Sequence, residues 1–391
     1  MPVSEAWHQR LADARADRQQ THRWRSRQVM ANGASESALD FAGNDYLGLA
    51  HDPRVSEAQA DGARRFGAGA GASHLVSGHL EVHDALEEAL AHWTGRERAL
   101  LFSTGYMANL GVLQALADRH TAIFQDRLNH ASLLDGAALS GARNRRFHHR
   151  DANDLENLLG RIEYAHKLVV SDGVFSMDGD VADVASLVSA CQRHHAWLMI
   201  DDAHGVGVLG DNGSGCVGST WSSAKVPILV GTFGKALGTA GAFVAGDAAL
   251  IDHLIQFSRS YIYTTAQPPA IAAATLKALD IVQREPEHRT TLNANIAYFR
   301  REALRLGLPL SDSTTPIQPL ILEDEARTLT WATRLQQHGV YVGAIRPPTV
   351  PKGEARLRIT LSARHSRHQI ERLLEALTAC QREETACLAN A

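Results

Sequence analysis

Short apolar runs alternate with amphipathic helical patterns along the chain as far as Pro268. Six runs have the length and composition of buried strands, at residues 99–102, 122–125, 168–171, 197–201, 228–230 and 242–245. Between two of them, apolar side chains recur at the i, i+3, i+4 and i+7 spacing of a helix that faces a core, at Val184, Leu187, Val188 and Cys191. Strands that alternate with helices pair through right-handed crossovers. We therefore predict an α/β fold whose mostly parallel central sheet is covered by helices on both faces.

The pattern changes after the Pro268-Pro269 pair, where long helical stretches cover residues 271–284 and 292–306. Residues 356–361 then alternate, with leucine and isoleucine on one face and Arg356, Arg358 and Thr360 on the other. This alternation predicts a half-buried strand, and a closing amphipathic helix follows it at 370–377. A smaller C-terminal α+β domain is the expected result.

The N-terminal segment predicts a polar, arginine-rich helix within residues 4–28, followed by a short strand pair with a turn at Asn32-Gly33. The resulting domain prediction has three parts. They are an N-terminal arm at 1–43, a large domain at 44–287 and a small domain at 288–391.

Composition narrows the class of protein. A net charge of −4 gives no electrostatic footprint for nucleic acid, and no apolar run approaches the length of about 18 residues that a membrane helix needs. The four cysteines lack C-x-x-C spacing, which favours a reducing compartment. The N-terminal region also lacks the apolar core of a secretion signal. We expect a cytoplasmic enzyme with no nucleic-acid or membrane partner.

Lys235 lies among three glycines, where the strand at 228–230 runs out into a loop. A Walker loop is excluded because Ala236 follows this lysine. Two interpretations remain for the side chain. It is either a solvated lysine on a glycine-rich turn or a lysine that forms a Schiff base with an aldehyde cofactor, with the Thr232 hydroxyl available to a phosphate.

Asp201 stands at the end of a buried strand, three residues before His204. A buried carboxylate is costly unless a cation pairs with it, and the protonated ring nitrogen of pyridoxal phosphate is such a cation. His204 could then bond to the phenolate oxygen of the same ring. The alternative is a metal pair of Asp201 and His204, but further ligands at a recognisable spacing are missing, so we predict no metal.

Other strand ends carry residues that suit the same cofactor. Backbone amides of Gly105 and Tyr106 open a helix, whose positive N-terminus favours a phosphate. His130 follows the strand at 122–125 and could stack on a flat ring, while a turn-rich loop exposes Ser176. Ligands of such sheets bind at the carboxyl ends of the strands, so these side chains are expected to meet there.

These motifs resemble the α-oxoamine synthases, a family of fold-type I pyridoxal-phosphate enzymes, over nearly the whole chain. The resemblance rests on residues 44–49, 126–132, 173–180, 201–205, 232–235 and 344–351. It implies a homodimer in which Thr264 and Thr265 reach the phosphate of the partner subunit. The implied catalytic residues are Lys235, His130, Asp201 and His204. The implied cofactor-binding residues are Gly105, Tyr106, His130, Ser176, Asp201, His204, Thr232 and Lys235. The implied substrate-binding residues are His130, Thr349, Arg358 and Arg25, with Arg23 as the alternative to Arg25.

Within this family, the segment 345–351 is most similar to the branch that forms 8-amino-7-oxononanoate for biotin. That resemblance implies the decarboxylative condensation of L-alanine with a pimeloyl thioester, carried by an acyl carrier protein or by coenzyme A. The alternatives are the sister activities of glycine C-acetyltransferase, 5-aminolevulinate synthase and serine palmitoyltransferase. An alternative of another class is a non-catalytic scaffold that keeps the fold.

Overall fold

The computed structural model describes residues 3–27, 29 and 39–389, and the side chains of 3 and 387–389 are not among them. The chain forms two compact units. The larger consists of Asn44–Asn293 with Ser362–Arg364, and the smaller of the described parts of Met1–Gly43, Ala294–Leu361 and His365–Ala391. The predicted turn at Asn32-Gly33 lies outside the described residues. Among the helices that are described, none has the length and apolar character needed to cross a bilayer.

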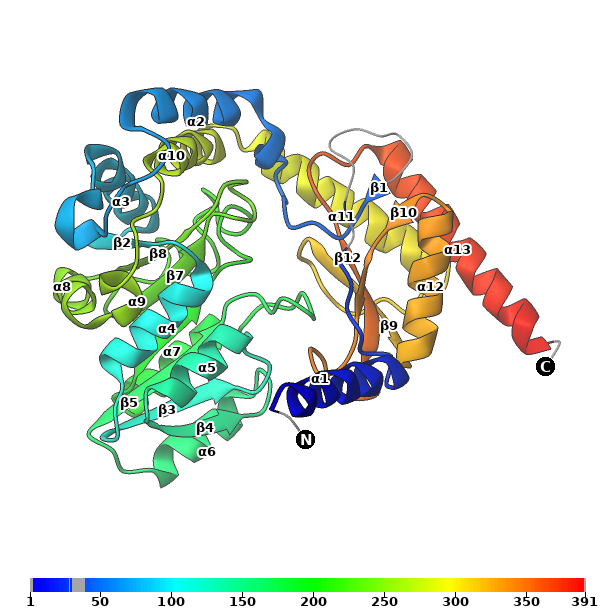
Figure 1. The fold of residues 1–391 in the computed structure, drawn as a ribbon, viewed down its shortest axis with the longest axis horizontal. Coiled ribbons are helices and arrows are strands. Elements are labelled where there is room, and N and C mark those ends of the chain that lie inside the picture. The colour runs from blue at the N-terminus through cyan, green and yellow to red at the C-terminus, as the bar shows by residue number, and fades with distance from the viewer. Residues whose placement is uncertain (1–2, 28, 30–38, 390–391) are drawn as a thin grey trace. The chain divides into compact units, whose positions relative to one another are not determined.

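The larger unit contains a seven-stranded sheet in the order β2-β8-β7-β6-β5-β3-β4 (Figure 1). Its strands are β2 (Arg98–Phe102), β3 (Thr121–Asp126), β4 (Arg143–Phe147), β5 (His166–Asp172), β6 (Trp197–Asp201), β7 (Ile228–Thr232) and β8 (Ala242–Gly246). Strands β4, β3, β5, β6 and β7 pair in parallel, and β8 is antiparallel to both β7 and β2. The mostly parallel sheet and the six predicted strands are confirmed.

Helices cover both faces of this sheet, some of them in direct contact with its strands and others packed on neighbouring helices. They are α2 (Pro53–Phe66), α3 (Glu81–Thr94), α4 (Gly105–Leu116), α5 (Ala131–Leu139), α6 (Ala152–Arg161), α7 (Val184–Arg193), α8 (Ala248–Phe257), α9 (Arg259–Ile262) and α10 (Pro269–Arg284), with short turns η1 (Leu49–His51) and η2 (His74–Gly78). Alternate strand residues face opposite sides, so Ile123 joins the core under α4 and α5, whereas Phe124 joins the core under α6 and α7.

Strand β4 was not predicted, because its sequence contains three arginines in place of an apolar run. It is the edge strand of the sheet, and most of its side chains are exposed. Charged side chains are typical of such edges, since they prevent pairing with other chains. An apolar pattern therefore finds the buried strands and misses this one.

The smaller unit has a three-stranded antiparallel sheet in the order β11-β12-β9 and a parallel pair of β1 with β10. Its strands are β1 (Leu39–Asp40), β9 (Ile317–Glu323), β10 (Val340–Tyr341), β11 (Gly343–Ile345) and β12 (Ala355–Thr360). Its helices are α1 (Val3–Gln20), α12 (Glu325–Gln337) and α13 (Arg367–Ala389), and α11 (Glu287–Arg305) extends across the boundary at residue 293.

The expected strand at 356–361 is present as β12, but the prediction that it is half-buried is wrong. β12 is the central strand, and both of its faces are covered. Arg356 and Arg358 are only 2% and 6% exposed. A buried guanidinium must bond to acceptors, and Arg356 does so with the Glu354 carboxylate at 2.8 Å.

Candidate active site

Four neighbouring parallel strands of the larger unit deliver polar residues to one edge of the sheet. The last residues of β3, β5, β6 and β7 are Asp126, Asp172, Asp201 and Thr232. Because the strands run in the same direction, these ends meet at the carboxyl edge, where open α/β sheets bind ligands. The edge therefore holds the candidate site.

Asp201 is 4% exposed and is bonded to uncharged groups. The Asn109 side-chain amide donates to its Oδ2 at 2.6 Å, and the Ala203 backbone N–H donates to its Oδ1 at 3.0 Å. No ion pair to Asp201 is formed within the described residues. The Oδ1 atom of Asn109 is also buried and accepts no hydrogen bond in that part of the chain. A buried carboxylate in this setting provides a strong attraction for a ligand cation.

A chain of hydrogen bonds runs from Asp201 to His130. The same Asn109 amide donates a second bond to the Ser132 hydroxyl at 2.8 Å, and that hydroxyl lies 2.7 Å from Nδ1 of His130. Nδ1 also accepts the Ser132 backbone N–H at 3.2 Å, so it is the acceptor of both bonds. The neutral ring therefore carries its proton on Nε2. Burial lowers the pKa of His130, which favours this neutral form.

Lys235 lies within electrostatic reach of the same groups. Its Nζ donates to the Thr232 hydroxyl at 3.3 Å, and the side chain is half-buried. Burial has the largest effect on the pKa of His130. Among the smaller effects, the charge of Asp201 raises this pKa and the charge of Lys235 lowers it. Both residues also act on the pKa of Asp172 in opposite directions. The lysine and the carboxylate therefore converge on one region.

Gly105 fixes the start of helix α4 against Thr232. A Cβ atom on Gly105 would lie 2.6 Å from Cγ2 of Thr232, so this close approach requires glycine. Thr104 caps the helix, accepting the Met107 N–H at 3.1 Å. Tyr106 is 41% exposed, and its hydroxyl donates to Asp135. The free amides of the first turn and the Thr232 hydroxyl together form a suitable phosphate cradle.

His204 is 9% exposed and lies beyond the end of β6. Its Nδ1 is 2.6 Å from the hydroxyl of Tyr46, a fully buried residue. That hydroxyl is also 3.2 Å from Oδ1 of Asn44. Tyr46 therefore orients the imidazole, a role that the sequence motif at 44–49 did not reveal.

Asp172 is a further residue that the sequence reasoning missed. It is the partner of Asp201 in the register of β5 and β6, and it accepts the His130 backbone N–H at 2.6 Å. Burial, followed by the neighbouring charge of Asp201, raises the pKa of Asp172 well above its ordinary value. The available signal was the one used for Asp201, a carboxylate at the end of a buried strand.

Of the predicted substrate residues, Arg25, Thr349 and Arg358 lie in the smaller unit, whereas His130 lies in the larger one. Arg25 donates through Nη2 to the Thr349 hydroxyl at 3.0 Å, so these two expected residues are brought together. Arg358 instead bonds to the Thr360 hydroxyl at 3.0 Å. In the larger unit, Thr264 is half-buried, Thr265 is exposed, and Ser176 is half-buried in the loop after β5.

Three histidines near α3 form a separate cluster in the larger unit, at His74, His79 and His83. Nδ1 of His74 lies 2.8 Å from Nδ1 of His79. His83 uses both ring nitrogens, since one accepts the Leu80 N–H at 3.0 Å and the other bonds to the Gln267 carbonyl at 2.8 Å. Burial lowers the pKa of all three. The cluster is a packed group of neutral imidazoles in which His83 already has both of its bonds.

Known proteins resemble the chain over nearly its full length. The family model described as aminotransferase class I and II matches residues 36–377. The 8-amino-7-oxononanoate synthase of Chromohalobacter salexigens is 66% identical over 384 residues, which cover 98% of this chain and 99% of that protein. The protein of the same name from Methylococcus capsulatus is 55% identical and covers 94% and 96%.

Solved structures agree with this relationship. A serine palmitoyltransferase from Sphingomonas wittichii superposes with a TM-score of 0.92 at 31% identity, covering 99% of this chain and 100% of that one. An 8-amino-7-oxononanoate synthase from Francisella tularensis has a TM-score of 0.79 at 31% identity, covering 90% and 100%. A serine palmitoyltransferase described with a pyridoxal-phosphate internal aldimine has a TM-score of 0.89 at 29% identity, covering 95% and 97%.

Proposed function

The chain belongs to the aminotransferase class I and II family and, within it, to the 8-amino-7-oxononanoate synthases, and from this we infer its reaction. It is a pyridoxal-phosphate-dependent acyltransferase of biotin biosynthesis. It condenses L-alanine with a pimeloyl thioester, releasing carbon dioxide and the free carrier and forming 8-amino-7-oxononanoate. The fold-type I architecture predicted from the sequence is confirmed.

One observation carries the proposal on the structural side. Asp201 is a buried carboxylate whose two bonds come from uncharged donors, and Lys235 lies within electrostatic reach of the same residues. A flat cationic heterocycle with an aldehyde would satisfy both groups, and the first turn of α4 would hold a phosphate on it. When bound, pyridoxal phosphate supplies an electron sink for the carbanion that forms at the α-carbon of alanine.

Each residue of the candidate site has a proposed task. Asp201 holds the proton on the ring nitrogen of the cofactor, and Asn109 keeps the carboxylate aimed at it. His130 would stack on the ring, and its bond to Ser132 fixes the tautomer that carries the proton on Nε2. His204, oriented by Tyr46, donates to the ring oxygen.

Lys235 is the proposed acid and base at the α-carbon of the substrate. Once it is free, its amine removes the α-proton of alanine and returns a proton after carbon dioxide is lost. The proposed phosphate ligands are Gly105, Tyr106, Ser176 and Thr232.

Substrate carboxylates are assigned to the arginines of the smaller unit. Arg358 has the planar fork that binds the alanine carboxylate bidentately, and Thr349 contacts the acyl donor. We further propose a cytoplasmic homodimer in which Thr264 and Thr265 reach the phosphate of the partner subunit. An acyl carrier protein or coenzyme A carries the pimeloyl group.

The decisive experiment is product analysis by mass spectrometry. Purified protein is given pyridoxal phosphate, then alanine, glycine or serine, each with pimeloyl, succinyl, acetyl or palmitoyl thioesters. We expect 8-amino-7-oxononanoate from alanine with pimeloyl donors, and a comparison of the carrier-protein and coenzyme A forms identifies the preferred carrier. Turnover of glycine with acetyl or succinyl donors in its place would overturn the assignment, and no cofactor binding at all would favour the scaffold.

Arg25→Ala should raise KM for the pimeloyl thioester about tenfold and leave kcat within about twofold. The reason is that Arg25 bonds to Thr349, whereas Nε of Arg23 is buried without a hydrogen-bond partner among the described residues. Steady-state kinetics of Arg25→Ala and Arg23→Ala, measured side by side, check the choice. A larger rise in KM for Arg23→Ala would transfer the assignment to Arg23.

A further inference from the structure

His149 bridges two segments that both lead into the candidate active site. Its Nδ1 lies 3.0 Å from Oδ1 of Asp126, the last residue of β3, four positions before His130. Its Nε2 lies 2.8 Å from Oδ2 of Asp180, which belongs to the loop that carries Ser176. His149 itself follows β4, so it belongs to neither segment. The imidazole therefore connects the two from outside.

The bridging geometry requires a charged ring. A carboxylate only accepts hydrogen bonds, so a ring bonded to one at each nitrogen must carry a proton on both. Burial alone would lower the pKa of His149, but the bonds to Asp126 and Asp180 outweigh it and raise the pKa to about 9. For Asp180 the signs are opposite. Burial alone would raise the pKa of this carboxyl group, but His149 and Arg150 outweigh burial and lower it.

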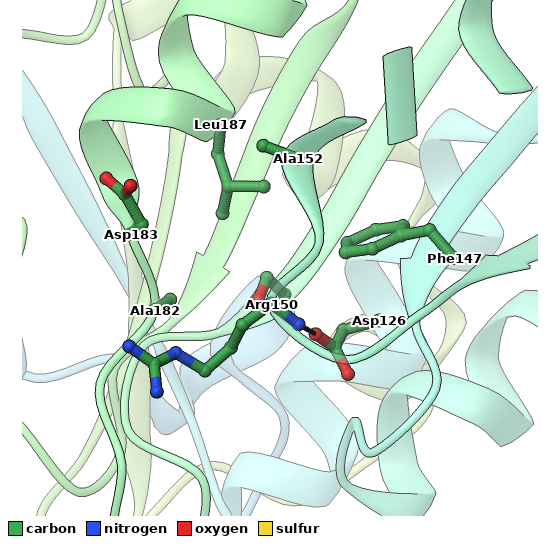
Figure 2. Close-up of a pocket in the computed structure, with 8 residues that line it drawn as sticks. Asp126, Phe147, Arg150, Ala152, Ala182, Asp183 and Leu187 are labelled. Atoms are coloured by element: carbon green, nitrogen blue, oxygen red, sulfur yellow. Dashed lines mark hydrogen bonds between the residues drawn. The ribbon is translucent and has the colours of Figure 1, made fainter. Parts of the chain in front are cut away.

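The rest of the surroundings stabilise the same arrangement. Figure 2 shows Arg150, whose backbone N–H donates to Oδ2 of Asp126 at 2.8 Å. Its guanidinium lies 3.1 Å from Oδ2 of Asp180 and is the other cation on that carboxylate. The rings of Phe175 and His149 make a T-shaped contact, with 4.4 Å between their centroids. Asp126 also accepts the Leu128 N–H at 2.8 Å.

The loop between β5 and α7 is folded onto Asp180. Phe175 N–H donates to the Asp180 carbonyl at 3.0 Å, and Gly179 N–H donates to the Phe175 carbonyl at 2.8 Å. Val174 and Val181 form a β-bridge that closes it. Oδ1 of Asp180 is buried and has no hydrogen-bond partner in the described part of the chain, so Oδ2 takes both cationic contacts. Without His149, the Asp180 carboxylate would keep only one of these two cationic contacts, the one with Arg150.

We propose that His149, as an imidazolium, is a positioning residue that holds the Ser176 loop against the strand end carrying His130 and thereby strengthens binding of pyridoxal phosphate. This proposal rests on the proposed function, since Ser176 and His130 act through that cofactor. His149 is not one of the proposed cofactor ligands. The two carboxylates, Arg150 and Phe175 are the groups that face it.

The direction of the pH effect follows from the charge. A pKa raised above the ordinary histidine value means that the stabilisation is complete below about pH 6.5 and is lost as the pH rises through about 9. Cofactor binding by the wild-type protein should weaken over that upper range. A variant without the imidazole should not show this part of the pH-dependent loss of affinity.

The test measures the dissociation constant of pyridoxal phosphate by absorbance titration from about pH 7 to pH 10. His149→Gln should bind about tenfold more weakly at pH 7.5, because one amide cannot donate to both carboxylates. Its affinity should also fall less with pH than that of the wild type. Any titration of Lys235 is common to both proteins, so the difference between the profiles isolates His149.

His148→Gln is the matched control. The neighbouring His148 is also paired with an aspartate, Asp154 at 2.6 Å, but its side chain is 60% exposed and Asp154 lies on α6, outside the Ser176 loop. It should leave both affinity and pH profile unchanged. Asp180→Asn keeps the shape and removes one carboxylate, so it should weaken binding in the same way and serves if His149→Gln does not fold.

Equal affinities and parallel pH profiles for wild type and His149→Gln, or wild-type affinity in Asp180→Asn, would overturn the positioning role. Failure of the wild-type protein to bind pyridoxal phosphate would instead refute the proposed function. Loss of affinity in His148→Gln equal to that in His149→Gln would also count against the proposal, because it would show a general effect of histidine loss in this segment.

Discussion

Lys235→Ala should reduce kcat by about a thousandfold or more, which makes it the most damaging single change that we predict. The proposed reaction needs the amine twice, to hold the cofactor covalently and to move the α-proton of alanine. Alanine at this position can do neither. Folding should be little changed, because the amine is half-buried and its 3.3 Å bond to the Thr232 hydroxyl is long.

The measurement combines activity with a direct test of the covalent bond. Borohydride makes the bond between lysine and cofactor permanent, so mass spectrometry should find the added mass on a peptide with Lys235 in the wild type. Lys225→Ala is the control, since Lys225 is an exposed lysine on the connection between β6 and β7. Labelling of another lysine, or full activity of Lys235→Ala, would contradict the mechanism.

The buried strands and the residues at their ends were predictable from sequence because apolar runs and strand-end polar residues are local signals. The run at 197–201 predicted both β6 and the place of Asp201. In the same way, the glycines around Lys235 predicted that this lysine lies in a loop after a buried strand. Their roles in binding cofactor remain predictions, although the structure brings Asp201, Lys235 and His130 within electrostatic reach of one another.

Residues that act through partners distant in sequence were not predictable in this way. Asn109 bonds to Asp201 across 92 positions, and Tyr46 bonds to His204 across 158. Each side chain is ordinary in its own segment, and only the folded sheet gives it a partner. The same reason explains β12, whose arginine face alternates in the sequence like an exposed one, although Arg356 and Arg358 are buried in the folded unit.

The choice of which aspartate carries chemistry is also a tertiary property. Asp201 and Asp202 are adjacent and both buried, but they face different surroundings. Asp202 accepts the Cys216 backbone N–H at 2.7 Å and its thiol at 3.2 Å, and burial raises the pKa of Asp202 to about 7. It is a structural acceptor, whereas Asp201 meets the amide of Asn109 at the candidate site.

Asp201→Asn should therefore lower kcat by about a hundred- to a thousandfold, because the neutral amide cannot keep the proton on the ring nitrogen. The variant should still fold, at a cost of about 1–2 kcal/mol, since one of the two bonds from Asn109 and Ala203 can be kept. Steady-state kinetics and thermal unfolding of the same preparation separate the two effects.

Asp202→Asn gives the opposite pattern and serves as the control. It should lower the unfolding temperature, because the amide nitrogen would face the Cys216 donors in a site with 0% exposure, and the folded fraction should keep a kcat near that of the wild type. If Asp202→Asn lost kcat while Asp201→Asn kept it, Asp202 would be the residue that holds the charge on the cofactor ring. The assignment of the ring nitrogen to Asp201 would then fail.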